Sequence, residues 1–398
     1  MSTQRRTIGI LACTQIISWG SLHYAFGILA PVIQDDLRLQ TSLVFGAYSW
    51  GSLVAGMVAT PFGILLDRYG GQLMLGAGSF VCGIGFIVLS TSHGPLAYIG
   101  AWTILGIAMG LVLYEAAFAT LNRRFAAGGR QAISTLTLFA GFSSTIFWPA
   151  TQFLNSEFGW RNTYFWFGAA QLLLCLPLHI MLGKEQSRHS SSTPSQRRSH
   201  TLVEAIRHPA FWKLTIAFAA NTFIFSALSV HLIPLLHDMG HSARVAVLMS
   251  MLIGPTQVIG RILERTVGHN STPQIVGIFC FTSLPAGLIA ICFFGTQAWA
   301  IACFCVTYGL SNGIITIVRG TLPQEMFGSK NYGAISGAMA GPALLGKAGG
   351  PIAAAMVLGY TGLPSTLLGL LLCVALVSVL SYLSAIRTAI VLRTSSSG

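Results

Sequence analysis

The chain has 398 residues, of which 53% are hydrophobic and only 8% are charged, and its formal net charge is +12. A water-soluble domain carries about 25% charged residues, so this composition excludes an ordinary soluble globular protein. The basic residues stand between long apolar runs rather than on one face, which indicates membrane topology and not binding to a nucleic acid.

Long apolar runs follow one another along the whole chain, and we predict that each is a transmembrane helix. Twenty helical residues span about 30 Å, which matches the hydrocarbon core of a bilayer. The runs lack the period-two alternation of a transmembrane β-barrel. The sequence therefore predicts an all-α membrane protein with twelve spans, near residues 7–33, 41–66, 73–91, 95–121, 131–155, 162–183, 209–237, 243–267, 273–293, 297–321, 332–358 and 362–386.

Lys and Arg are unevenly distributed between the two sides of the predicted membrane. With both termini in the cytoplasm, sixteen of the 22 basic residues fall on the cytoplasmic side, three in outer loops and three inside spans. Because cytoplasmic loops carry the excess of positive charge, we expect an integral protein of the plasma (inner) membrane with both termini cytoplasmic.

His23 lies near the middle of the first predicted span, and it shares a helical face with Trp19, Gly20 and Gly27. A lone histidine is usually a satisfied core residue, whereas its aromatic and glycine neighbours favour pore lining. Both interpretations stay open at this point. Further polar candidates for the substrate site lie in later spans, namely Tyr114, Asn221, Tyr308 and Asn312.

The segment between the second and third spans reads GILLDRYGGQ (63–72). It resembles the G-x-L-x-D-R-x-G-R-[RK] signature of the major facilitator superfamily, which occupies the same loop. The sequence GWR (159–161) before the sixth span and the polar central linker extend the resemblance over the whole chain. It implies the major facilitator fold, with twelve helices in two pseudo-symmetric six-helix bundles. The chain departs from the signature at 71–72, where the family usually has two basic residues.

The resemblance also implies a role for the acidic residue of the signature. Asp67 would help to latch the two halves in the outward-open state, with Arg68 beside it. Arg123 or Arg124, at the end of the fourth span, is a candidate partner for the carboxylate. The alternative is that the three arginines only set the topology.

A polar segment, 184–208, divides the chain close to its midpoint. Its serine-rich and basic composition cannot build a core, so we predict a flexible cytoplasmic linker that ends in a short amphipathic helix. The predicted domains are an N-terminal bundle of residues 1–183 and a C-terminal bundle of residues 209–398. The matches between PVIQD (31–35) and PLLHD (234–238), at an offset of 203, support repeated halves.

Four charged residues stand out inside predicted spans, because a charge at the bilayer centre costs at least about 2.5–3.5 kcal/mol and is a functional hypothesis by default. Lys347 stands about 14 residues into the eleventh span. Ala340, Ala343 and Gly350 share its face, and we expect them to leave open volume beside the ammonium. The alternative for this lysine is a structural ion pair.

Arg261, the second of these charges, depends on how the halves are aligned. At the constant offset of about 203, Asn270 matches Asp67 and Arg261 lies inside the eighth span. Gln257, one turn earlier on the same face, could then share a ligand with it. The alternative alignment, at an offset of 197, makes Arg261 part of a decayed loop motif on the cytoplasmic flank.

The remaining two charges, Glu115 and Arg319, occupy corresponding positions in the fourth and tenth spans. They could form a gate bridge that breaks as the cavity opens inward. Glu115 could instead carry a proton, because desolvation raises a carboxyl pKa. A static structural pair is the third interpretation.

A guanidinium on the eighth span and an ammonium on the eleventh resemble the monocarboxylate and oxalate/formate antiporter branch, in which such cations bind the substrate carboxylate. Arginine offers a planar fork to a carboxylate and lysine a point charge. We therefore predict a permease, a secondary transporter that moves a small organic anion by alternating access. The alternative is proton-coupled efflux of a neutral or cationic molecule.

Catalytic motifs are absent from the sequence, so no enzyme activity is predicted. We also predict no cofactor, no metal and no nucleic-acid partner. The expected partners are the substrate, with protons or a counter-transported anion, and the lipid bilayer. We expect a monomer.

Overall fold

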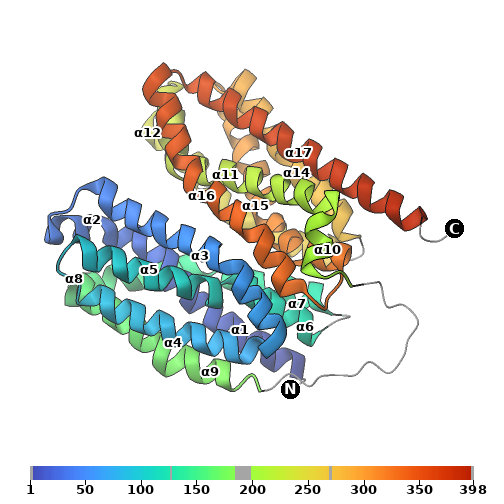
Figure 1. Ribbon diagram of the computed structural model, residues 1–398. Helices are drawn as coiled ribbons and strands as arrows, with labels where there is room; N and C mark the ends of the chain where they lie inside the picture. Colours follow the sequence, from blue (N-terminus) through green and yellow to red (C-terminus); the bar gives the residue numbers. More distant parts are fainter. Residues whose placement is uncertain (1–2, 126–127, 184–198, 269–270, 396–398) are drawn as a thin grey trace. The chain divides into compact units, whose positions relative to one another are not determined.

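The computed structural model describes residues 3–125, 128–183, 199–268 and 271–395 (Figure 1). Within these ranges the regular secondary structure is entirely helical and contains no strand. The reason is that lipid offers no hydrogen-bond partners, so each apolar segment must pair its N–H and C=O groups internally.

The described residues contain 11 helices that are long and apolar enough to cross a membrane. One of them, Gly129–Ile180, has 52 residues and would measure about 78 Å if it were straight, far more than one bilayer. Its backbone leaves the helical conformation at Gly159, where φ is +76° and a side chain would be strained. This break separates the predicted fifth and sixth spans, so the twelve-span fold is confirmed.

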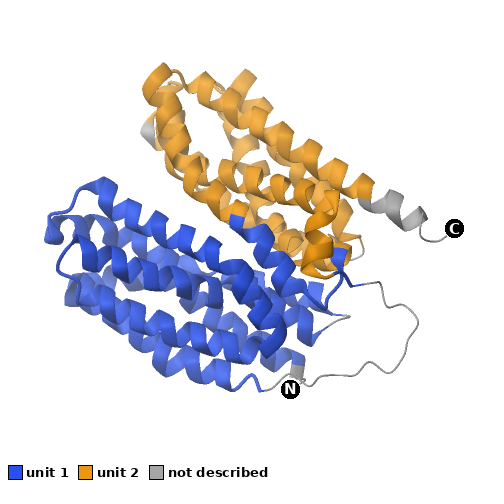
Figure 2. Cartoon of the chain, viewed as in Figure 1, with its two compact units in different colours: residues 1–200, 327–341 blue, residues 201–326, 342–398 orange. Residues whose placement is uncertain are grey.

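The chain divides into two compact units (Figure 2). Unit 1 comprises residues 1–200 and 327–341, and unit 2 comprises residues 201–326 and 342–398. The helices of unit 1, in chain order, are α1 (Thr3–Trp19), η1 (Gly20–Tyr24), α2 (Ala25–Leu37), α3 (Thr41–Tyr69), α4 (Gly71–Ser90), α5 (Pro95–Val112), α6 (Tyr114–Arg124), α7 (Gly129–Ala140), α8 (Ser143–Ala170), η2 (Gln171–Cys175) and α9 (Leu176–Ile180).

Unit 2 begins with the short helix α10 after the central linker. Residues 184–198 of the predicted linker lie outside the described residues. Thr201 and Glu204 form a capping box at the start of α10, each side chain bonding the main-chain N–H of the other. The helices are α10 (Leu202–Arg207), α11 (Pro209–Asp238), α12 (Ala243–Ser250), α13 (Ile253–Thr266), α14 (Pro273–Phe294), α15 (Ala298–Phe327), α16 (Tyr332–Thr361) and α17 (Pro364–Ser395), with the first ten residues of α16 belonging to unit 1.

Unit 1 is held together by close helix contacts and by buried hydrogen bonds. A Cβ at Gly106 of α5 would lie 2.4 Å from the main-chain oxygen of Gly51 on α3, so only glycine allows this approach. His179 of α9 is fully buried, with Nδ1 2.9 Å from the Ser79 hydroxyl and Nε2 3.0 Å from the Thr14 hydroxyl. Together these bonds tie α9 to α4 and α1.

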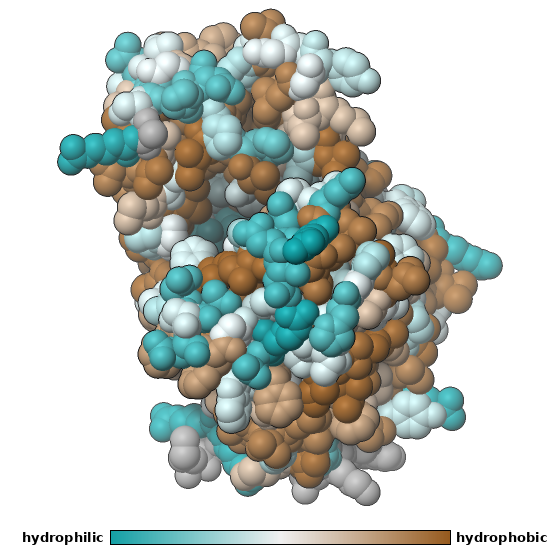
Figure 3. All heavy atoms as spheres, turned by 90° about the vertical axis from the view of Figure 1, so that its left-hand side faces the viewer, coloured by the Kyte–Doolittle hydropathy of each residue, from teal (hydrophilic) through white to brown (hydrophobic). Residues whose placement is uncertain are grey.

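The core of unit 2 is a single apolar cluster contributed by α11, α12, α14, α15, α16 and α17. Both units expose large hydrophobic side chains on their flanks. Examples, with their exposed fractions, are Leu96 (85%) and Leu173 (78%) in unit 1 and Phe293 (75%) in unit 2. Figure 3 shows hydrophilic residues gathered near the helix ends that face the viewer and hydrophobic residues on the flanks. This distribution suits a protein whose flanks contact lipid.

Candidate functional site

Asp67, the acidic residue of the signature segment, binds the first turn of α16 within unit 1. Its two carboxylate oxygens accept hydrogen bonds from the main-chain N–H groups of Gly333, at 3.0 Å, and Ala334, at 2.8 Å. Gly63 makes this contact possible, because a Cβ there would lie 2.0 Å from the Gly333 oxygen. A carboxylate at a helix N-terminus satisfies unpaired N–H groups and complements the helix dipole.

The arginines that were candidate partners of Asp67 bind main-chain carbonyls. Arg123 donates to the main-chain oxygens of Leu66, at 3.0 Å, and of Asp67 itself. Arg124 reaches the end of the sixth span and donates to Leu182 and Gly183. Basic side chains at helix C-termini stabilise the exposed carbonyls there. Arg68 is exposed, and its guanidinium lies 5.3 Å from the centre of the Tyr69 ring.

Glu115 stands directly after a break in the fourth span. Leu113, which separates α5 from α6, has an extended backbone with φ −83° and ψ −168°. The amide of Gln15, fully buried on α1, donates to the Val112 oxygen at the end of α5, at 2.5 Å. Glu115 then lies in the first turn of α6 and lines a cavity of about 10 Å³, with room for about one water.

His23 and Tyr114 belong to one aromatic cluster in unit 1. His23 lies in the π-helical segment η1, and its Nδ1 is hydrogen-bonded to the Tyr48 hydroxyl on α3. Its ring centre is 5.7 Å from that of Trp19, which in turn lies 4.8 Å from the ring of Tyr114. π-Helical segments frequently occur at functional sites. Sequence reasoning missed Tyr48, which no local pattern connects with His23.

The three cations predicted inside spans all lie in unit 2. Arg261 on α13 is only 8% exposed, and Glu264, one turn later, is 3% exposed. Arg319 on α15 and Lys347 on α16 are half-buried. Asn270, the predicted counterpart of Asp67, lies outside the described residues. Sequence reasoning missed Glu264, although its spacing from Arg261 is a signal for a side-chain pair.

The small residues on the face of Lys347 serve helix packing rather than open volume. A Cβ at Gly350 would lie 2.5 Å from the Phe223 oxygen on α11, and Ala343 is 1% exposed. Glycine and alanine allow two transmembrane helices to approach closely, so this face of α16 is buried against protein.

Gln257, Tyr308 and Asn312, three of the predicted substrate-binding residues, line one cavity of about 280 Å³ in unit 2. Ser229 and Ser250 add hydroxyls to an otherwise apolar lining. The Tyr308 hydroxyl donates to the main-chain oxygen of Phe225, at 3.1 Å. Asn221 is buried on α11, and the cavity lining does not include it. The volume is close to the lower end of the range for small-molecule pockets, about 300 Å³.

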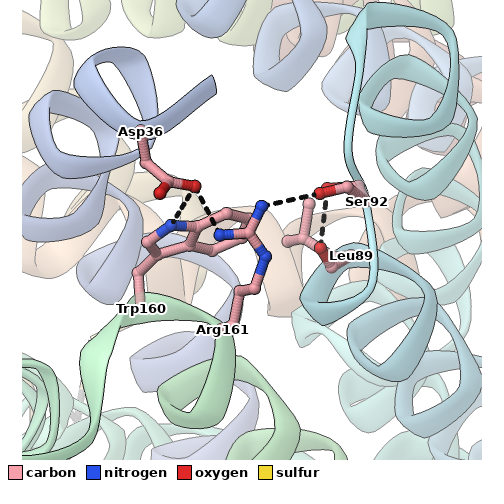
Figure 4. Close-up of polar contacts among 5 residues, drawn as sticks. All are labelled: Asp36, Leu89, Ser92, Trp160 and Arg161. Carbon is pink, nitrogen blue, oxygen red and sulfur yellow. Dashed lines mark hydrogen bonds and ion pairs between the residues drawn. The ribbon is translucent and has the colours of Figure 1, made fainter. Parts of the chain in front are cut away.

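A further polar cluster ties the predicted outer ends of three spans in unit 1 (Figure 4). Asp36, at the end of α2, accepts hydrogen bonds from the Trp160 indole, at 3.2 Å, and from Arg161. Arg161 also donates to the main-chain oxygen of Ser92, at 3.1 Å, after α4. The turn at Gly159 places both donors side by side. Sequence reasoning singled out GWR (159–161) but missed Asp36.

Residues 11–351 match the sequence model of the Major Facilitator Superfamily. The chain belongs to the Major Facilitator Superfamily. Solved structures with a similar fold include the human organic anion transporter MFSD10 (TETRAN), with a TM-score of 0.77 and 14% identity over 96% of this chain and 100% of that one. Another is the major facilitator transporter FucP in the outward conformation, with a TM-score of 0.68 and 14% identity over 95% and 97% of the two chains.

Family and fold together indicate a secondary transporter that works by alternating access, rather than an enzyme. At this level of identity the two solved structures show the fold alone. They leave the predicted monocarboxylate and oxalate/formate branch without confirmation.

Proposed function

We propose that this transporter moves a small organic anion, with a carboxylate as its charged group. The observation that carries the proposal is the set of cations in the membrane-spanning helices of unit 2: Arg261 is buried, and Arg319 and Lys347 are half-buried. A charge inside a membrane is costly and marks a functional site, and cations there suit a negatively charged substrate.

Arg261 and Lys347 would supply complementary chemistry to such a ligand. The guanidinium is a planar fork that can bind both oxygens of a carboxylate, whereas the ammonium is a compact point charge. The structural similarity to MFSD10, an organic anion transporter, agrees with this substrate class. The same two cations are the basis for placing the chain in the monocarboxylate and oxalate/formate branch.

Transport would then involve the remaining predicted residues in the following way. The bundles 1–183 and 209–398 move relative to one another, with both termini on the cytoplasmic face of the plasma membrane. Asp67 holds the first turn of α16 to α3 in one state and releases it in the other, with Arg123 supporting the end of α3. Glu115, beside its small cavity, takes part in gating or in proton coupling.

The test is uptake by purified protein in proteoliposomes, with a panel of radiolabelled mono- and dicarboxylates and with or without a pH gradient. We expect Lys347→Ala to lower uptake of the transported carboxylate at least about tenfold, and Lys347→Arg to retain more of it. Lys213→Ala is the matched control, because Lys213 is a cation of unit 2 that donates to the Thr388 hydroxyl instead. Unchanged carboxylate uptake by Lys347→Ala would overturn the proposal.

A second candidate function is proton-coupled efflux of a neutral or cationic molecule. The cavity lined by Gln257, Tyr308 and Asn312 supports it, because none of the lining residues carries a formal charge. The two candidates respond differently to substitution. Efflux of an uncharged substrate would survive Lys347→Ala, whereas transport of an anion would be lost.

A further inference from the structure

The surface of unit 1 contains a groove of about 690 Å³ between α4 and α9, which lie side by side in Figure 1. Leu73, Ala77 and Phe80 line it from one face of α4, and Leu176 and Ile180 line it from the sixth span. Leu73, Phe80 and Ile180 are each more than half exposed. A groove of this size lies within the range of ligand pockets, about 300–1,000 Å³.

One end of the groove is polar and the rest is apolar. Tyr69, Gly70 and Gln72 line the polar end, where the Gln72 amide donates to the Ile180 oxygen at 2.6 Å. The exposed Arg68 precedes Tyr69 in the chain, and its guanidinium lies 5.3 Å from the centre of the Tyr69 ring, which lines the groove. A cation beside an aromatic ring and an amide suits a phosphate group.

The length of the groove matches one leaflet of a bilayer. The ten residues of α4 from Gly71 to Phe80 rise about 15 Å, which is half of a hydrocarbon core of about 30 Å. The polar end coincides with the signature segment, where the predicted topology puts the cytoplasmic surface. An acyl chain that begins at this surface would therefore end near the middle of the bilayer, at Phe80.

We propose that this groove is a binding site for one anionic phospholipid, with its phosphate beside Arg68 and Tyr69 and one acyl chain along Leu73, Ala77 and Phe80. Anionic lipids are concentrated where basic residues flank a span, and each such residue contributes an attraction worth about fivefold in binding. All residues that line the groove belong to unit 1, whereas the cations proposed to bind the substrate belong to unit 2.

Native mass spectrometry of the purified full-length protein tests the proposal with phosphatidylglycerol and phosphatidylcholine of identical acyl chains. We expect the wild type to retain phosphatidylglycerol at least fivefold better than phosphatidylcholine. Ala77→Trp fills the groove from an exposed position and should abolish this preference. The matched control is Ala286→Trp, at an exposed alanine of α14 outside the groove, which should keep it.

Arg68→Gln separates the charge from the shape of the groove, and because Arg68 is exposed the variant should fold. We expect its preference for phosphatidylglycerol to fall about fivefold, while phosphatidylcholine binds as before. Equal retention of the two lipids by the wild type would show an unselective lipid shell and overturn the proposal. Full retention of phosphatidylglycerol by Ala77→Trp would overturn it as well.

Discussion

The fourth and tenth spans occupy corresponding positions in the two halves, yet they differ in backbone and in charge. The fourth is interrupted at Leu113, so that α5 and α6 are separate helices, and it carries the acid Glu115. The tenth, α15, is one helix of 30 residues and carries the cation Arg319 at the corresponding position. The two spans that the sequence pairs therefore differ in backbone continuity and in the sign of their charge.

The same contrast extends to the surroundings of these two spans. In unit 1 the break is flanked by Gln15 and by the aromatic cluster of Trp19, His23 and Tyr114. In unit 2 the unbroken α15 contributes the half-buried Arg319. The predicted membrane-embedded acid thus belongs to unit 1, and the three predicted membrane-embedded cations belong to unit 2.

The largest expected effect is that of proline substitution, which should destabilise the protein far more in the continuous tenth span than at the break of the fourth span. Val318→Pro, inside α15, removes a helical hydrogen bond and should destabilise the protein by about 3 kcal/mol or more. Tyr114→Pro, at the first position of α6 and after an extended residue, should cost little beyond the loss of the ring. Thermal unfolding in detergent measures both, with Tyr114→Ala as the reference for the ring. Equal destabilisation by the two prolines would contradict a built-in break.

Removal of the hydrogen bond from Gln15 to Val112, at the break in the fourth span, should have an intermediate effect on stability. Gln15→Leu leaves the Val112 oxygen buried without its donor, which should cost about 1–3 kcal/mol. Gln40→Leu is the control, because Gln40 is exposed and makes no capping bond to α3, and we expect a change within about 0.5 kcal/mol. Denaturant or thermal unfolding of both variants checks the difference. If Gln15→Leu were as stable as the wild type, the hydrogen bond from Gln15 would not stabilise the break.

The smallest effect is expected at the outer ends of the spans. Asp36 is paired with Arg161 in unit 1, whereas the position 203 residues later is Met239, which packs against Gly295. The ion pair is partly exposed, so Arg161→Lys should cost no more than about 1 kcal/mol. The cost should shrink further in high salt, because partly exposed charges are screened. A thermal shift that is independent of salt would contradict an electrostatic contribution.

The sequence predicted the spans well because bilayer thickness and backbone pairing leave few alternatives for long apolar runs. It also singled out Asp67 as a latch residue, but the bonds of its carboxylate to the main chain of Gly333 and Ala334 needed the structure. The break at Leu113 was missed because neither proline nor glycine marks it. Gln15, Tyr48 and Asp36 were missed for a related reason, namely that their partners are distant in sequence and depend on tertiary packing.

The most direct test of the account is whether Lys347 recognises the charge of the substrate. Equilibrium binding would be measured for a transported carboxylate and for its neutral primary amide, in the wild type, Lys347→Met and the control Lys213→Ala. The account predicts that the wild type and the control bind the carboxylate at least about tenfold more tightly than the amide, a difference of about 1.4 kcal/mol. It also predicts that Lys347→Met loses most of this discrimination. Equal discrimination by Lys347→Met and the wild type would contradict the central claim.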